Sequence, residues 1–119
     1  MIFDFETFSK IAANVYRECS TTYSLEEALA VFRYFFEAYE RNTGQVHPHI
    51  RKEHIRNIIQ IMPYPDTEGL VGGTDYLFPE DYPTLIDAYF ATRFWDCDYR
   101  INHFFSGKVR TFRCFEEVI

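Results

Sequence analysis

The stretch Ser24–Gly44, SLEEALAVFRYFFEAYERNTG, predicts a long helix with a defined start and a defined end. At the start, Ser24 and Glu27 have the S-x-x-E spacing of a capping box, in which each side chain satisfies a backbone amide of the other residue. At the end, Gly44 can adopt the left-handed conformation that closes many helices. Between these ends the apolar residues recur three or four positions apart and form one stripe, which contains Leu25, Ala28, Leu29, Phe32, Phe35, Phe36 and Tyr39.

This stripe is rich in aromatic rings, and so is the rest of the chain. Thirteen Phe, nine Tyr and one Trp occur among 119 residues. Each buried ring removes roughly 150–250 Å² from water, so a short chain can bury a large apolar area with few residues. Because most of the rings recur at helical spacing, the composition predicts a core built from rings. It indicates how the chain folds and does not identify a reaction.

Two more helices are expected in the first half of the chain. Asp4 is the predicted N-cap of a helix over residues 4–18, where apolar residues recur at helical spacing. A second helix is expected to begin near His47, because Pro48 suits a first helical turn in which its missing N–H costs nothing. Pro63 is expected to end this helix, since proline cannot continue it.

The second half of the chain is less regular. A helix is expected from about Pro83 to Trp95 with Asp81 as its cap, and residues 99–105 fit two helical turns. Residues 64–79 contain three glycines and predict a long irregular loop. Beyond residue 108 the apolar spacing fits a last short helix, while β-branched residues there also fit a strand.

These patterns predict a mainly α fold, a single globular domain over residues 1–119 that forms a compact bundle of four to six helices. A small β-hairpin near the C-terminus is the open alternative. Three widely spaced cysteines and the lack of a signal-peptide pattern favour free thiols in a reducing compartment, so we expect a cytoplasmic protein. No apolar run approaches the roughly 20 residues of a membrane span. Aromatic rings beyond those needed for the core could line an interface between two copies of the chain, so a homodimer is an alternative to a monomer.

The charges alternate in sign along the chain, and their total is −6. Residues 64–98 carry one basic and eight acidic side chains, a net charge of −7. Residues 45–63 carry three basic and one acidic, and residues 99–119 carry four basic and two acidic, so each of these segments has a net charge of +2. An acidic total disfavours a protein that holds nucleic acid over a wide surface, but it leaves room for a small basic patch.

The acidic segment leads to the main functional hypothesis. A face rich in carboxylates can occupy a basic groove of another protein, such as the phosphate channel of a nucleic-acid enzyme. We therefore expect a non-catalytic accessory or inhibitory protein that binds a basic partner. The expected contacts are five carboxylates and two apolar anchors: Asp66, Glu68, Asp75, Glu80 and Asp81, with Tyr76 and Phe78. The alternative for each carboxylate is that it is hydrated at the surface and contacts no partner.

The basic segments lead to a second hypothesis, a small regulator that binds DNA or RNA. Cations interleaved with rings can neutralise phosphates and stack bases. The candidate residues are Arg51, Lys52 and Arg56 on the expected third helix and Lys108, Arg110 and Arg113 in the C-terminal tail.

Metal binding and catalysis are not expected. His47, His49, Glu53 and His54 cluster in sequence, but their H-x-x-x-E-H spacing matches no metalloprotease motif. Cys97, His103 and Cys114 lack the close spacing of a structural zinc site. A nucleophilic pair of Cys97 with His103 is disfavoured, since the neighbouring aspartates would raise the pKa of the thiol. We therefore expect no cofactor and no enzymatic activity.

Overall fold

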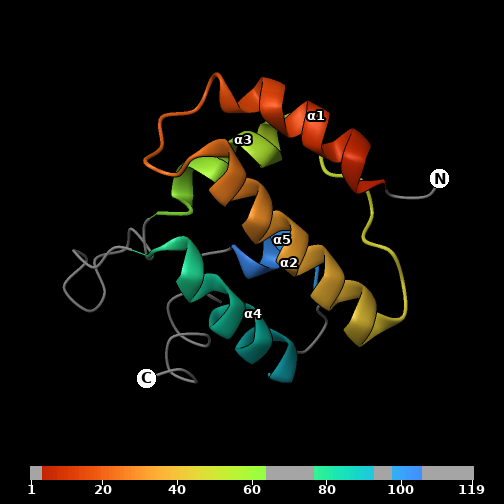
Figure 1. The fold of residues 1–119 in the computed structure, drawn as a ribbon. Coiled ribbons are helices and arrows are strands. Elements are labelled where there is room, and N and C mark those ends of the chain that lie inside the picture. The colour runs from red at the N-terminus through yellow and green to blue at the C-terminus, as the bar shows by residue number, and fades with distance from the viewer. Residues whose placement is uncertain (1–3, 64–76, 93–97, 106–119) are drawn as a thin grey trace.

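The computed structural model describes residues 4–63, 77–92 and 98–105, which form a mainly α-helical bundle (Figure 1). The predicted fold class is therefore confirmed. No strand occurs among these residues, and most of the expected 64–79 loop and the expected C-terminal hairpin lie outside them. The elements are α1 (Phe5–Tyr16), α2 (Leu25–Thr43), α3 (Lys52–Ile61), a 3₁₀ turn η2 (Pro79–Asp81), α4 (Tyr82–Ala91) and the one-turn α5 (Ile101–Phe104).

The central helix is α2, which passes between α1 and α4 (Figure 1). On one side Phe32 and Phe36 meet the Phe8 ring of α1, with ring centroids 4.9 and 5.1 Å apart. On the other side Phe35 meets Phe90 of α4 at 5.2 Å and Phe104 of α5 at 5.4 Å. These are the tilted and edge-to-face geometries that aromatic pairs prefer. The expected core of rings is thus confirmed in the described residues.

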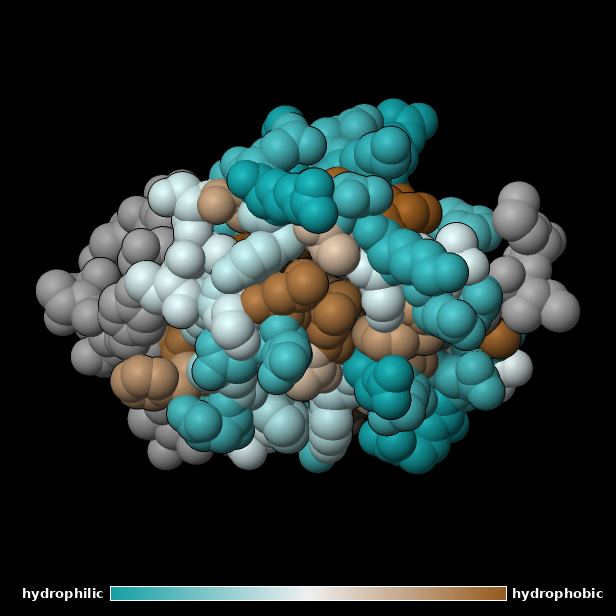
Figure 2. Space-filling view, turned by 45° about the horizontal axis from the view of Figure 1, so that its top comes forward, coloured by the Kyte–Doolittle hydropathy of each residue, from teal (hydrophilic) through white to brown (hydrophobic). Residues whose placement is uncertain are grey.

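Figure 2 shows one face, where hydrophilic side chains surround a group of apolar ones near the middle. Each helix has turned its apolar stripe inward, as the periodicity predicted.

The predicted helix caps are present. The Ser24 hydroxyl accepts the Glu27 amide at 3.1 Å, and the Glu27 carboxylate accepts the Ser24 amide at 2.8 Å. At the start of α1 the Asp4 carboxylate accepts the Glu6 amide at 3.1 Å. At the end of α2 Gly44 has a φ of 73°, and its N–H donates to the carbonyl of Glu40. Local sequence therefore determines both ends of the longest helix.

The predicted start of the third helix was wrong. The helix begins at Lys52, and residues 47–50 have no helical structure. His47 lies in this irregular segment, where its side chain is 3% exposed. Its Nδ1 lies 2.7 Å from the Pro48 carbonyl, and its Nε2 accepts the Ile101 amide at 3.0 Å. The bond from the Ile101 amide, 54 residues away, outweighs the preference of Pro48 for a first helical turn.

Asp81 occupies the N-cap position of α4, as expected, but its side chain has another role. Its carboxylate makes no capping bond to α4. Instead it accepts the Phe78 amide at 2.8 Å and so caps the 3₁₀ turn that precedes α4. Pro83 does lie in the first turn of α4, and the helix ends at Ala91, before the expected end at Trp95, which is outside the described residues.

Tyrosine hydroxyls fasten the end of α3 to the start of the next described segment. The Tyr82 hydroxyl donates to the Met62 carbonyl at 2.6 Å, and the Tyr23 hydroxyl lies within hydrogen-bond distance of the Met62 and Leu77 carbonyls. The Leu77 amide also donates to the Pro63 carbonyl at 3.0 Å. The residues that flank the segment 64–76 are therefore held side by side.

Replacement of Gly44 should test the left-handed end of α2. A Cβ at this position would meet nothing within 4 Å, so the cost of Gly44→Ala is conformational and not steric. We expect a loss of about 1 kcal/mol in the free energy of unfolding, measured by urea denaturation. Gly44→Asn should lose less, because asparagine tolerates this conformation better. An alanine variant as stable as the wild type would contradict the assignment.

Candidate functional site

Phe78 is a large apolar residue with an exposed side chain. It is 55% exposed, and among the described residues the only other exposed large apolar side chain is Val46, at 44%. The backbone on both sides of Phe78 is fixed, because the Leu77 amide bonds to Pro63 and the Phe78 amide bonds to Asp81. The backbone position from which this ring projects is thus set by the fold.

A hollow of about 350 Å³ lies beside the Phe78 ring. It is lined by Phe78 and Pro79 together with three residues at the start of α2 and just before it, Thr22, Tyr23 and Glu27. Tyr23 is buried and anchored by its hydroxyl, whereas Glu27 is exposed. The arrangement combines an apolar wall with a carboxylate, which suits a side chain that is apolar along its stem and cationic at its tip.

Three of the seven residues of the expected acidic face lie in the described residues. Phe78 and Glu80 are exposed, whereas Asp81 is half-buried and its carboxylate is occupied by the turn. The other four, Asp66, Glu68, Asp75 and Tyr76, lie outside the described residues. Glu27 also lines the hollow, although the sequence analysis had assigned it only to the capping box.

The expected basic surface is present in part. Arg51, Lys52 and Arg56 are exposed at the start of α3 and along it. Arg56 approaches Glu18 at the end of α1, with Nη1 and Oε1 3.8 Å apart. Both side chains are well exposed, 44% and 65%, so this ion pair contributes little stability but offsets one of the three cations. The other three cations, Lys108, Arg110 and Arg113, are outside the described residues.

The histidines do not assemble a metal site in the part of the chain that the structure describes. Among these residues no three His, Cys, Asp or Glu side chains lie close enough together to hold a metal ion. Both ring nitrogens of His47 are engaged in hydrogen bonds, and Nδ1 of His54 lies 3.2 Å from the Asn102 amide nitrogen. Nδ1 of His103 lies 2.8 Å from the Tyr89 hydroxyl. Cys97 and Cys114, which the sequence analysis considered and disfavoured as partners of His103, are outside the described residues.

His47 is held in its neutral form. Burial lowers the pKa of its imidazole from 6.5 to about 4. The neutral ring donates from Nδ1 to the Pro48 carbonyl and accepts the Ile101 amide at Nε2, so protonation would remove the acceptor. The Tyr39 and Phe36 rings lie against the imidazole, with centroids 4.7 and 4.9 Å away. His47 therefore joins the segment after α2 to the start of α5.

Comparison with known proteins found no family model that matches the chain, and no match among curated proteins or solved structures. Within the described ranges, no helix combines the length and the apolar character that a membrane crossing needs.

Acid should weaken the fold through His47. Between pH 6.5 and about 4 the unfolded chain binds a proton that the folded imidazole excludes, so the free energy of unfolding falls as the pH falls through this window. The difference between the two pKa values corresponds to about 3 kcal/mol. Urea denaturation over this pH range would measure the loss. His103, whose pKa burial also lowers, adds a loss of the same sign.

The variant His47→Gln should show a much smaller loss over the same range, because its amide does not titrate. His49→Gln, at an exposed position, is the matched control and should keep the wild-type profile. If the profile of His47→Gln equalled that of the wild type, the buried neutral imidazole would not be the cause.

Proposed function

We propose that this protein is a non-catalytic accessory or inhibitory factor that binds a basic surface of another protein through the face around Phe78. The observation that carries the proposal is the 55% exposed Phe78 ring on a fixed backbone. Phe is among the aromatic residues enriched in the buried cores of interfaces, where a few residues dominate the binding energy.

The charges near this ring support a basic partner. Glu27 lines the same hollow as Phe78, and Glu80 is exposed two residues after Phe78. Complementary charges of this kind speed association and select partners more than they add affinity. An enzyme that handles nucleic acid fits this chemistry, because its phosphate channel presents fixed basic side chains. In this proposal Asp66, Glu68, Asp75 and Tyr76 extend the contact face.

Replacement of Phe78 should separate binding from folding. In a quantitative pull-down, Phe78→Ser is expected to weaken capture of a basic protein partner by about 2 kcal/mol, roughly 30-fold in Kd. Glu80→Lys should slow association, an effect that added salt masks. Asp81 is left unchanged because its carboxylate holds the turn.

The matched control is Glu6→Lys, an exposed charge reversal in the first turn of α1. It should leave capture unchanged. If Phe78→Ser and Glu80→Lys captured the same proteins as strongly as the control, this face would not be the binding surface.

A second function, nucleic-acid binding, is favoured by one specific feature. Arg51 and Lys52 are exposed at the start of α3 and make no ion pair with another described residue. In this alternative they contact phosphates together with Arg56, Lys108, Arg110 and Arg113.

A mobility-shift assay with short DNA and RNA duplexes and single strands tests this alternative. Binding through these cations should weaken steeply with salt, and Arg51→Glu with Lys52→Glu should abolish it. The control is Lys10→Glu, an exposed cation on α1. If no shift occurs at about 50 mM salt, nucleic-acid binding is excluded as the function.

A further inference from the structure

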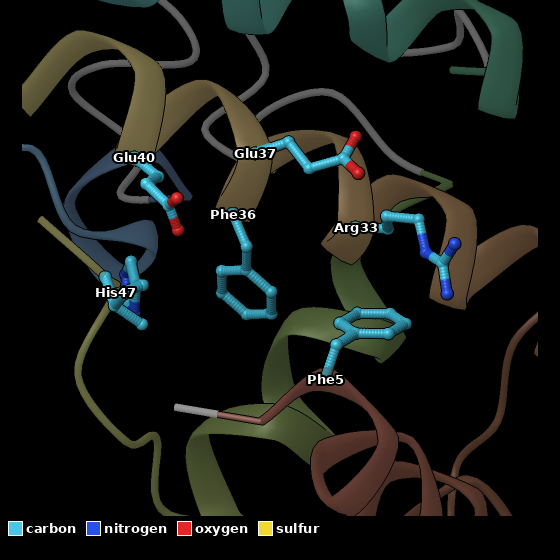
Figure 3. A pocket seen from close by; sticks show the side chains of 7 residues that line it. Phe5, Arg33, Phe36, Glu37, Glu40 and His47 are labelled. Carbon is cyan, nitrogen blue, oxygen red and sulfur yellow. The ribbon is translucent and has the colours of Figure 1, made fainter. Parts of the chain in front are cut away.

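One buried imidazole links α5 to the rest of the bundle. The His47 ring packs against the Tyr39 and Phe36 rings of α2, with centroids 4.7 and 4.9 Å away, and lies beside the blue ribbon of α5 (Figure 3). The Pro48 carbonyl can only accept, so it requires a hydrogen on Nδ1. The Ile101 amide can only donate, so it requires a bare Nε2. The geometry therefore admits one form of the ring, the neutral tautomer protonated at Nδ1.

The position of α5 depends on contacts with other elements, because a helix of four residues is too short to be stable by itself. Besides Ile101, the next two residues of α5 take part in hydrogen bonds that involve imidazole nitrogens. Nδ2 of Asn102 lies 3.2 Å from Nδ1 of His54 in α3. Nδ1 of His103 lies 2.8 Å from the Tyr89 hydroxyl of α4. Three successive residues thus attach α5 to three different parts of the bundle.

These three attachments respond differently to a proton. The Tyr89 hydroxyl and the Asn102 side chain can each accept as well as donate, so both can also bond to a protonated imidazole. The Ile101 amide cannot accept, so a proton on Nε2 of His47 would leave two hydrogens facing each other. Acid therefore acts on α5 chiefly through His47.

Charged groups from two elements lie near the His47 ring. Three charged side chains of α2 line a small hollow together with it (Figure 3): Arg33, Glu37 and Glu40. From the segment before α5, Arg100 lowers the pKa of His47 and Asp98 raises it. Burial has the largest effect, and the pKa of the ring is about 4. A proton on His47 is therefore costly while α5 is in place.

The ring contacts that join α1 to α2 do not involve α5. Phe8 meets Phe32 with ring centroids 4.9 Å apart, whereas α5 packs through Phe104 on Phe35 and Tyr89, at 5.4 and 5.1 Å. If α5 moved away, Phe35 and Tyr89 would lose a neighbour, but the pair of α1 with α2 would keep its contact. The fold can therefore open at α5 without unfolding as a whole.

We propose that α5 is an acid-released part of the fold: a proton from solvent binds Nε2 of His47, expels the Ile101 amide, and lets α5 leave the bundle while α1 and α2 stay packed. The loss of stability in acid therefore begins with a local opening. This device does not depend on the function proposed for the Phe78 face.

Amide hydrogen exchange at pH 7 and pH 5 tests the release. With an imidazole pKa of 6.5 in the open state and about 4 in the closed state, the opening constant of α5 should rise about 20-fold between these pH values, after correction for the chemical exchange rate. The reporters are the Ile101, Phe104 and Phe105 amides, which are bonded in the closed state. At both pH values they should open more readily than the Phe32 amide inside α2. No rise in acid, or equal opening constants for α5 and Phe32, would overturn the proposal.

The variant His47→Gln assigns the effect to the imidazole. The glutamine amide can accept the Ile101 hydrogen bond without titrating, so most of the rise should disappear. His103, whose pKa burial also lowers, accounts for the remainder. The control His49→Gln, at an exposed position, should keep the full rise. Circular dichroism verifies that both variants are folded. A full rise in His47→Gln would assign the opening to another group and contradict the proposal.

A measurement on the wild type needs no substitution. The N–H···N bond between Ile101 and His47 should transmit a scalar coupling between its two nitrogen nuclei, which NMR detects at pH 7. If this coupling were absent at pH 7, the bond on which the release depends would not exist, and the proposal would be wrong.

Discussion

The burial of aromatic rings on two sides of α2 is the constraint on which the rest of the structure depends. Phe32 and Phe36 pack on α1, and Phe35 packs on α4 and α5. A helix that is apolar on two sides has only a narrow strip left for solvent. Arg33, Glu37 and Glu40 occupy part of that strip, so the packing of the rings also decides which charged groups of α2 stand together at the surface.

Polar bonds from buried rings then position the segments between the helices. Tyr23 and Tyr82 reach the carbonyl of Met62, and His47 reaches the amide of Ile101. Each bond satisfies a backbone group near a helix end that has no partner within its own helix. The hollow beside Phe78 lies next to one of these segments, and Tyr23 lines it. Tyr23 thus contributes both to the core and to the candidate site.

The sequence predicted the features that depend on interactions between neighbouring residues, and it missed features that depend on residues far apart in the chain. The Ser24–Glu27 box and the left-handed Gly44 need only neighbours within four residues, and both were confirmed. The start of α3 was mispredicted because His47 is bonded to Ile101, 54 residues away.

The candidate sites show the same difference between local and long-range interactions. Phe78 was expected as an exposed anchor because it follows an acidic loop, and the ring is exposed. The hollow beside it needs Thr22, Tyr23 and Glu27, which come from a distant segment and carried no binding signal of their own. The pairing of Arg56 with Glu18 likewise joins α3 to α1 and was missed.

The central claim, that rings of α2 hold the fold while Phe78 is left at the surface, is tested most directly by the unfolding free energies of two matched variants. Phe35 is 0% exposed, so Phe35→Ala should lose about 3–5 kcal/mol in urea denaturation. Phe78→Ala should lose less than about 1 kcal/mol. Equal losses at the two positions would contradict this division between core and surface.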